Sequence, residues 1–290
     1  MIRIDLHLHS TFSDGSMTPE ALVAHGRSKG VTVMSLTDHD TVDGLPSFMA
    51  ACARWNMAGI PGIELSADHA RTVHILGYRL DLRRAGSASS ASAQGNTPSM
   101  GMKKMLEEVR RGRDERNAAM CENLRRMGLD ITLDEVALEA GGDVVARPHM
   151  ARVLVRKGYA QDIVSAFARY LNTSSPAYVE RYRLSPEDCI RMIADAGGLA
   201  VLAHPAQTTG DLSELREIVR MLKDAGLWGI ECVSSRASAE QIFRYLSLAA
   251  EFSLFPTAGN DFHGANRPSA MMGVPVAEDF LPWARLGVSL

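Results

Sequence analysis

The sequence predicts an α/β protein, a distorted seven-stranded (β/α)7 barrel that carries a small helical insertion. Three observations lead to this prediction. Short apolar runs typical of strands recur along the chain, helix patterns separate most of them, and this alternation breaks once for more than a hundred residues. Strands that alternate with helices are typical of a parallel sheet covered by helices. A chain of 290 residues, 46% of them hydrophobic, is long enough for one large core and an insertion.

Seven runs are predicted to form strands, because each is short, rich in aliphatic residues and bounded by polar or turn-forming residues. In chain order they are residues 2–9, 31–37, 60–66, 72–79, 199–203, 228–233 and 254–258. Two barrel helices have recognisable beginnings. Thr18 and Ser185 each precede a proline and a glutamate, the pattern of an N-cap followed by proline at the first helical position.

The alternation breaks between the fourth and fifth strands. Residues 85–100 are rich in Ser, Ala and Gly and have no hydrophobic period, which predicts a mobile loop. Helix patterns follow at 102–127, 133–139, 148–157 and 161–171. We therefore expect a barrel made of residues 1–99 and 184–290, and a helical insertion, residues 100–183, over its C-terminal face. With 15 Lys and Arg against 12 Asp and Glu, the insertion suits a lid over an anionic substrate.

Composition limits the class of protein. A net charge of -3 argues against a general nucleic-acid coat protein, which would carry a strongly basic face, but it allows a small anionic substrate. The four cysteines are widely spaced and form no CxxC pair, as expected in a reducing cytoplasm. Neither a leader-like segment nor a run of about 18 apolar residues occurs. We expect a cytoplasmic protein without membrane contact or an obligate protein partner.

Imidazoles and carboxylates follow the predicted strands where apolar runs give way to loops. His7 and His9 project from one face of a strand, so they can chelate one cation. The nine candidate metal ligands are His7, His9, Asp14, His39, Glu64, His74, His204, Asp261 and His263. Nine N and O donors exceed the four that a structural ion takes. We therefore expect two or three divalent ions, with Mn favoured over Fe or Zn, and open positions for hydrolytic chemistry.

Some of these residues have a second interpretation. Glu64 ends a buried strand, where bridging two cations would remove the cost of a buried carboxylate, but a salt bridge to a barrel arginine would also do so. His74 lies within an apolar strand and can be an ordinary core histidine. Of Asp38 and Asp40, we expect one to orient an imidazole and the other to be solvated.

Arg147 and His149 stand at the start of a predicted insertion helix. Helix N-termini attract anions, and arginine adds a bidentate fork for phosphate. A helix cap with a surface salt bridge explains the same residues equally well. Four other insertion arginines are expected to be solvated charges: Arg113, Arg116, Arg181 and Arg183.

The order of these motifs resembles the PHP (polymerase and histidinol phosphatase) family of metal-dependent phosphoesterases over nearly the whole chain. The stretches that carry the resemblance are DLHLHSTFSDG, SLTDHDT, GIEL, VHILGY, VLAHP and GNDFHG, and VVARPHMARVLV with AYV in the insertion. The insertion motifs are similar to the branch that contains 3′,5′-nucleoside bisphosphate phosphatase and ribonuclease AM. One departure is TSSP at 173–176, where many relatives carry a lysine, and another is Ala206, where glycine is frequent.

The resemblance implies the ligand sets and the substrate contacts. One ion would be held by His7, His9, Glu64 and Asp261, a second by Glu64, His74 and His204, and a third by Asp14, His39 and His263. Arg147 and His149 would hold a phosphate of the substrate. Asp261 would be catalytic, with either His204 or His263 as the proton donor to the leaving oxygen.

The expected activity is hydrolysis of a nucleotide phosphate monoester, first of all the 3′-phosphate of a nucleoside 3′,5′-bisphosphate (pAp to AMP), and trimming of short 5′-phosphorylated RNA. Histidinol-phosphate phosphatase is the rival within the family. An amidohydrolase-like deaminase or lactonase is disfavoured, because its site would be bridged by a carboxylated lysine and the five lysines here fall in helix or loop patterns. A non-enzymatic regulatory module is disfavoured because all nine ligand positions are filled.

Overall fold

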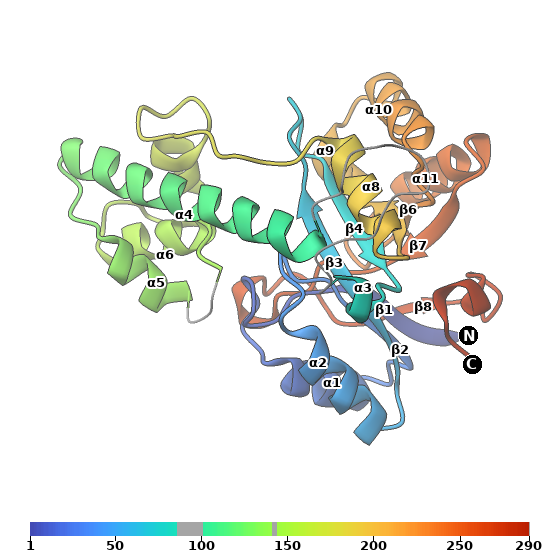
Figure 1. Cartoon of the computed structure of the whole chain (residues 1–290). Coiled ribbons are helices and arrows are strands. Elements are labelled where there is room, and N and C mark those ends of the chain that lie inside the picture. The colour runs from blue at the N-terminus through green and yellow to red at the C-terminus, as the bar shows by residue number, and fades with distance from the viewer. Residues whose placement is uncertain (86–100, 141–143, 290) are drawn as a thin grey trace. The chain divides into compact units, whose positions relative to one another are not determined.

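The structure, a computed structural model, describes residues 1–85, 101–140 and 144–289. The chain forms two compact units, which we call the barrel unit (Met1–Leu106 with Leu184–Leu290) and the insertion unit (Glu107–Arg183). Figure 1 shows the elements of both units, and each unit is described by itself. The predicted loop at 85–100 lies, except for its first residue, outside the described residues.

One curved sheet forms the centre of the barrel unit, with the strand order β7-β6-β5-β4-β3-β2-β1-β8. Its strands are β1 (Ile2–Leu8), β2 (Val33–Leu36), β3 (Ala58–Ser66), β4 (His74–Tyr78), β5 (Leu199–Leu202), β6 (Gly229–Val233), β7 (Phe255–Ala258) and β8 (Val274–Val276). The prediction of seven parallel strands needs correction. The described residues contain eight strands, and β4 and β8 run antiparallel to their neighbours.

Both differences have a local cause. A parallel pair needs a crossover of about a dozen residues or more, whereas only residues 67–73 join β3 to β4. The eighth strand escaped the pattern analysis because it is three residues long and contains Pro275, which cannot donate a hydrogen bond to a neighbouring strand. It pairs with residues 2–4 of β1 at one edge of the sheet.

The sheet curls so far that the chain leaving β7 meets β1 again. The N–H of Phe262 donates to the carbonyl of His7 (3.1 Å), and the N–H of His9 donates to the carbonyl of Phe262 (2.9 Å). The result is a nearly closed barrel. Its closure places Asp261 and His263 beside the end of β1.

Helices cover the outside of the sheet. They are α1 (Pro19–Ser28), α2 (Leu45–Arg54), α3 (Leu82–Ala85), α8 (Pro186–Asp195), α9 (Pro205–Thr208), α10 (Leu212–Asp224) and α11 (Ala239–Glu251), with the 3-10 turns η2 (Gly264–Asn266) and η3 (Trp283–Leu286). Both predicted N-caps are confirmed: Thr18 Oγ1 accepts from the N–H of Ala21 (3.2 Å), and Ser185 Oγ accepts from the N–H of Asp188 (3.0 Å). In Figure 1, α1 and α2 lie together, and α11 lies beside β6 and β7.

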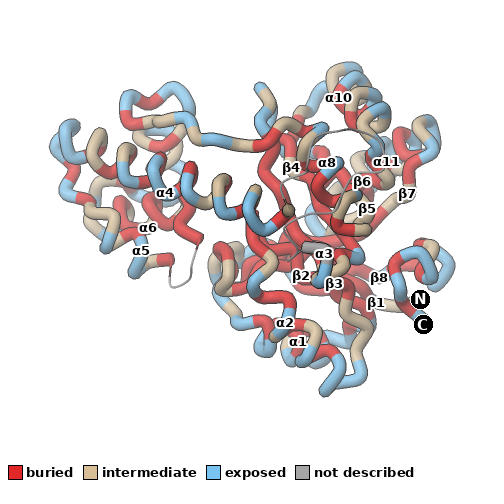
Figure 2. Tube along the Cα trace, in the orientation of Figure 1, coloured by how far each residue is buried: buried red, intermediate tan, exposed pale blue. Residues whose placement is uncertain are grey.

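Aliphatic side chains from the strands fill the barrel below their polar ends. The core cluster includes Ile4, Leu6, Val33, Ile60, Leu76, Tyr78, Val201 and Ala258, joined by Leu281, Trp283 and Leu286 near the C-terminus. Burying one such aliphatic side chain contributes about 1.5–3 kcal/mol. Figure 2 shows the strands buried along most of their length, while α10 and α11 expose their outer faces. This core holds the strand ends, and therefore the polar residues on them, in place.

The insertion unit has a hydrophobic core of its own. Its helices are α4 (Met102–Arg126), which begins in the barrel unit, α5 (Leu133–Ala140), α6 (Arg147–Arg156) and α7 (Ile163–Ala166), continued by the π-helical turn η1 (Phe167–Leu171). These positions agree with the predicted helices to within a few residues. Its core includes Leu124, Ile131, Val136, Met150, Leu154 and Leu171. Among the described residues of both units, no helix is long and apolar enough to cross a bilayer.

Candidate metal centre and its surroundings

His7 and His9 lie at the polar end of β1, and both are completely buried. Their Nε2 atoms lie 3.2 and 3.1 Å from Oε2 of Glu64. The same nitrogens lie 3.6 and 3.3 Å from Oδ1 of Asp261. Two imidazoles and two carboxylates therefore converge on a common point, and they are the four residues of the first ligand set that the sequence resemblance implies.

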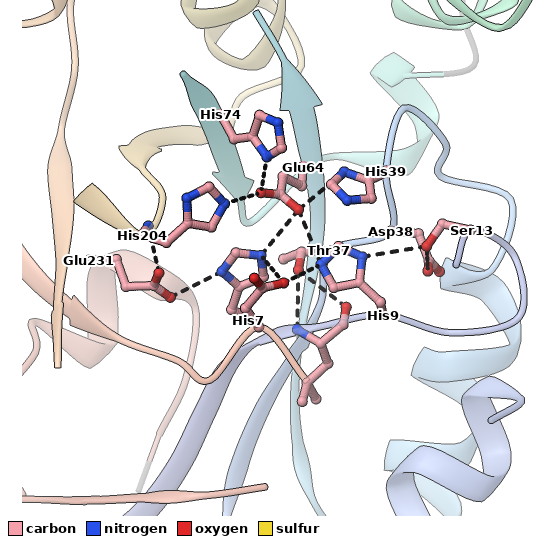
Figure 3. Close-up of polar contacts among 12 residues, drawn as sticks. His7, His9, Ser13, Thr37, Asp38, His39, Glu64, His74, His204 and Glu231 are labelled. Atoms are coloured by element: carbon pink, nitrogen blue, oxygen red, sulfur yellow. Dashed lines mark hydrogen bonds and ion pairs between the residues drawn. The ribbon is translucent and has the colours of Figure 1, made fainter. Parts of the chain in front are cut away.

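Glu64 stands at the centre of the whole arrangement (Figure 3). Besides His7 and His9, its Oε2 faces Nδ1 of His39 at 3.2 Å. Its other oxygen, Oε1, lies 2.8 Å from Nδ1 of His74 and 3.0 Å from Nε2 of His204. These contacts favour Glu64 and His74 as metal ligands over the alternatives, a salt bridge to a barrel arginine and an ordinary core histidine.

The third set of predicted ligands gathers around Asp14. Its Oδ1 lies 3.0 Å from Nε2 of His263, and its Oδ2 lies 3.9 Å from Nε2 of His39. His9 also approaches this group, with Nδ1 3.7 Å from Oδ1 of Asp14. All nine predicted ligands are thus brought together at the strand ends.

Buried nitrogen and oxygen atoms without a hydrogen-bond partner indicate whether these residues suit metal ions. Six atoms at the centre are buried without a hydrogen-bond partner among the described residues: His7 Nε2, His9 Nε2, Asp14 Oδ1, His39 Nδ1, Glu64 Oε2 and His204 Nδ1. Three of these nitrogens lie 3.1 to 3.2 Å from Oε2 of Glu64 without forming a hydrogen bond to it. Three sets have ligand atoms within 4.8 Å of one another: His7, His9, Glu64 and Asp261; His9, Asp14, His39 and His263; and His39, Glu64 and His74. Imidazole and carboxylate donors in such sets suit Mn, Fe or Zn.

Electrostatics keeps the carboxylates charged despite their burial. Burial alone would raise the pKa of Glu64, but the charges of His39 and His7 hold it well below its usual range. Burial likewise opposes ionisation of Asp14, whose pKa is nevertheless held low by His263 and His39. Negative charge concentrated among imidazoles favours a cation between them.

Glu231 on β6 supports the centre, and it is a functional residue that sequence analysis missed. Its Oε1 lies 3.1 Å from Nδ1 of His7, and its Oε2 accepts the backbone N–H of His204 at 2.7 Å. A carboxylate on Nδ1 leaves Nε2 of His7 available to a metal. The repeat of Gly-Ile-Glu at 62–64 and 229–231 is the sequence signal that would have found it.

Gly259 makes this contact sterically feasible. A Cβ atom at this position would lie 2.5 Å from Cβ of His7 and 2.7 Å from Oε1 of Glu231. Any side chain here would therefore separate the supporting carboxylate from the imidazole.

Asp38 and Asp40 are both buried, so the expectation that one of them is solvated is wrong. Asp38 accepts hydrogen bonds from Oγ of Ser10 and Oγ of Ser13, each at 2.6 Å. Ser13 Oγ lies 3.4 Å from Nδ1 of His9, so Asp38 orients that imidazole through a serine. Asp40 instead accepts the backbone N–H of Ser66 at 3.3 Å.

The two oxygens of Asp261 face different surroundings. Oδ1 faces the imidazoles, whereas Oδ2 is contacted by the guanidinium of Arg267, lies 3.7 Å from Arg236 and accepts from Gln207 Nε2 at 3.4 Å. Nothing in the sequence pattern marked either arginine, because neither stands directly at a strand end. They add positive charge to one side of the centre.

In the insertion unit, Arg147 and His149 occupy the first turn of α6. Arg147 Nη1 donates to the carbonyl of Leu171 (3.1 Å), and its guanidinium lies over the rings of Phe167 and Tyr178 at 5.9 and 5.5 Å. His149 is completely buried, and its Nδ1 accepts the N–H of Ala146 at 3.0 Å. Its burial favours a role in shaping the loop that carries Arg147 over a direct contact with phosphate.

Arg113 and Arg116 are buried, each with 5% of its surface exposed, so the expectation of solvated charges is wrong for these two. Burial lowers the pKa of Arg116 to about 8, and the neighbouring charges of Arg113, Arg181 and Arg147 add to the effect. Buried like charges are costly unless an anion compensates them. The insertion unit therefore gathers several arginines around Arg116.

The chain is similar to known proteins along most of its length. Residues 5–224 match the PHP domain. The chain is 32% identical to a 3′,5′-nucleoside bisphosphate phosphatase of Chromobacterium violaceum, over 98% of this chain and 95% of that protein. It is 29% identical to a 5′-3′ exoribonuclease of Haemophilus influenzae, over 96% and 99% of the two chains. A solved structure of an amidohydrolase from Chromobacterium violaceum with bound sulfate superposes with a TM-score of 0.83 at 29% identity, over 98% and 95% of the two chains.

Proposed function

The chain belongs to the PHP domain family, and on that premise we propose that it removes the 3′-phosphate from nucleoside 3′,5′-bisphosphates and also trims short 5′-phosphorylated RNA. The first part is supported by similarity to a nucleoside bisphosphate phosphatase over nearly the full length of both chains. The second is supported by similarity of the same extent to a 5′-3′ exoribonuclease.

The observation that carries the proposal is the cluster of part-buried and buried arginines in the insertion unit. The candidate metal centre accounts for the phosphate that is cleaved. This chain has a further set of guanidinium groups, Arg116 and Arg147 among them, in which burial and like-charge repulsion favour an anion. A substrate with two phosphates explains both features. The metal centre would cleave one phosphate, and the insertion arginines would hold the other.

Of the three sets whose ligand atoms lie together, one consists of the residues that the resemblance implies for the first ion, and the other two overlap with the second and third implied sets. We propose that His7, His9, Glu64 and Asp261 hold the first, that Glu64, His74 and His204 hold the second, and that Asp14, His39 and His263 hold the third. Such ions lower the pKa of water from about 15.7 to about 7 and neutralise phosphoryl oxygens, which is the chemistry that hydrolysis of a phosphate ester requires.

The leaving oxygen needs a proton, and His204 is the better placed donor. His263 Nδ1 is hydrogen-bonded to the carbonyl of Asp261 (2.9 Å), and its Nε2 lies at ion-pair distance, 3.0 Å, from Oδ1 of Asp14. His204 engages Nε2 at Glu64, and its Nδ1 has no hydrogen-bond partner among the described residues. Its ring also borders the pocket beside Asp261.

In the insertion unit, we assign Arg147 to the phosphate that is not cleaved, and His149 to holding the turn that presents Arg147. The carbonyl of Leu171 engages Nη1 of Arg147. The other N–H groups of the guanidinium can form a bidentate contact with phosphate.

A substrate panel tests the proposal. The Mn-loaded protein is given pAp, AMP, histidinol phosphate and a short 5′-phosphorylated RNA, and released phosphate and products are measured. We expect pAp to be converted to AMP and inorganic phosphate, the RNA to be shortened from its 5′ end, and AMP to be nearly inert. Preference for histidinol phosphate would instead support the rival activity.

A further inference from the structure

A pocket of about 210 Å³ opens in the barrel unit beside Asp261 and His204. Its walls come from the ends of β5 and β6, from α11 and from the segment after β7. In Figure 3, His204 and Glu231 mark one side of Glu64, and Ser13 and Asp38 lie on the other. The pocket therefore adjoins the His204 side of the metal centre.

Two arginines supply the positive charge of this pocket. Arg236 and Arg267 both line it and keep about 30% of their side-chain surface exposed. They approach the same oxygen of Asp261: Arg267 contacts it, and Nη2 of Arg236 lies 3.7 Å from it. Two guanidinium groups thus face one carboxylate oxygen, which leaves several of their N–H groups available to another acceptor.

Glu231 also lines the pocket, so its carboxylate and that of Asp261 balance the charge of the two arginines. Its two oxygens, however, lie against His7 and the backbone N–H of His204. Gln207 supplies a neutral amide, while Cys232, Val233 and Tyr245 supply less polar walls. The guanidinium groups of Arg236 and Arg267, next to these less polar walls, suit an anion with an organic substituent.

We propose that Arg236 and Arg267 form an anion subsite that binds the phosphoryl group of a phosphomonoester, with the esterified group in the pocket. Asp261 lies between this subsite and the ligands His7 and His9, so an anion on the outer N–H groups of the arginines lies one carboxylate away from the metal centre. Arginine binds phosphate through two parallel hydrogen bonds, a geometry that lysine cannot reproduce. The inference rests on the proposed phosphatase activity and adds specificity-determining residues to it.

If Arg236 and Arg267 had a purely structural role, a different result would be expected. If the arginines only neutralised Asp261, their loss would disturb that carboxylate and the metal it holds. Arg236 separates the two explanations, because its Nη2 lies 3.7 Å from Asp261, beyond hydrogen-bond distance. Its removal should leave Asp261 held by Arg267 and Gln207.

The test measures binding of inorganic phosphate to the Mn-loaded protein by calorimetry and metal content by elemental analysis, for R236Q, R236K, R267Q and R236Q/R267Q. We expect the dissociation constant of phosphate to rise about 10- to 150-fold for R236Q and further for the double variant, at unchanged metal content. R236K should retain part of the affinity, because it keeps the charge and loses the fork. R216Q, which removes a surface arginine paired with Glu251, is the matched control and should bind phosphate as the wild type does.

Two results would overturn the inference. One is phosphate affinity within twofold of the wild type in both R236Q and the double variant. The other is a fall in metal content of R236Q that parallels its loss of phosphate affinity, which would make Arg236 a support for Asp261.

The phosphate-binding test of the subsite can fail or succeed independently of the pAp assay that tests the proposed function. If pAp is not a substrate but phosphate binding depends on Arg236, the subsite stands and the nucleotide assignment fails. If R236Q binds phosphate and hydrolyses pAp as the wild type does, the function stands and the subsite fails.

Discussion

Glu64 and Asp40 show how burial alone fails to identify a functional carboxylate. Both are almost completely buried at the ends of neighbouring strands. Glu64 faces five imidazole nitrogens with its two oxygens. Asp40 accepts a backbone N–H from Ser66. The contacts of Glu64 are those expected of a carboxylate that bridges cations, whereas the contact of Asp40 supports the backbone of β3.

The pair therefore gives a matched test. Glu64→Gln should lower kcat/KM by more than about 100-fold at saturating metal. Asp40→Asn should lower it by no more than about 10- to 100-fold, the loss typical of residues that only support metal ligands. Elemental analysis should show loss of metal in the Glu64 variant alone. Equal kinetics and equal metal content in the two variants would contradict a bridging role for Glu64.

His204 and His263 differ in the partners of their ring nitrogens, and leaving-group chemistry can distinguish them. A nitrophenolate leaves without a proton, whereas a ribose oxygen needs one. At matched metal content, His204→Asn should lose more activity on a nucleotide than on 4-nitrophenyl phosphate, by about 10²-fold or more, the typical contribution of general acid catalysis. His263→Asn should lower both activities alike. The reverse pattern would assign the proton to His263.

Arg147 should contribute to the binding of a second phosphate. Arg147→Ala is expected to lower kcat/KM for pAp by about 10- to 150-fold, the loss of one charge-assisted contact, with little effect on 4-nitrophenyl phosphate. Arg152→Ala is the control, because Arg152 lies on the same helix and pairs with Glu139 (2.9 Å). If the Arg147 variant loses both activities to the same extent, the insertion arginines do not select the bisphosphate.

At the scale of elements, the site depends on how strands end. Asp40, His204 and Asp261 follow β2, β5 and β7, and each has a positive φ, at 54°, 26° and 53°. Asp and His are among the residues that adopt this region more readily than most. Such backbone strain is commonly found at functional sites. The sharp turns let the chain leave the sheet while the side chains of His204 and Asp261 stay beside the other candidate ligands.

The helices that brace these strands depend on local caps, and α8 offers a stability test. Ser185→Ala removes the Oγ that accepts the N–H of Asp188, and it should lower the free energy of unfolding by about 1 kcal/mol. Denaturant unfolding at a fixed metal concentration measures this change. Ser213→Ala is the control, since Ser213 lies exposed in the first turn of α10, where its backbone N–H meets Asp211. Equal stability of the two variants would show that the Ser185 cap contributes nothing.

At the scale of the whole molecule, the metal centre links the beginning and the end of the chain. His7 and His9 come from the first strand, Glu64 from the third, and Asp261 and His263 from the segment after the seventh. Ions held between them would join these distant segments. Metal binding should therefore contribute to global stability.

Exhaustive chelation should lower the Tm and abolish activity, and added Mn should restore both. An ion present at 100 times its dissociation constant stabilises the native state by about 2.7 kcal/mol. Elemental analysis of the loaded protein should find two or three equivalents, and the Tm of Glu64→Gln should respond less to chelation. Activity that survives chelation, or a single bound equivalent, would contradict the three-ion arrangement.

Local patterns determined much of this protein. The alternation in β1 predicted that His7 and His9 share one face, and the caps at Thr18 and Ser185 predicted two helix starts. The nine candidate ligands were found because each follows or lies within an apolar run. These features depend on residues close together in the chain, so the sequence is sufficient to predict them.

Only the tertiary structure decided the rest, because the contacts involved join residues far apart in sequence. Glu231 supports His7 across 224 positions, and although the Gly-Ile-Glu repeat marks Glu231, it does not indicate that His7 is its partner. The same holds for the burial of Asp40 and Arg116, and for the approach of Arg236 and Arg267 to Asp261. A side chain's neighbours determine whether it is solvated, paired or a ligand, and they are set by the packing of the whole chain.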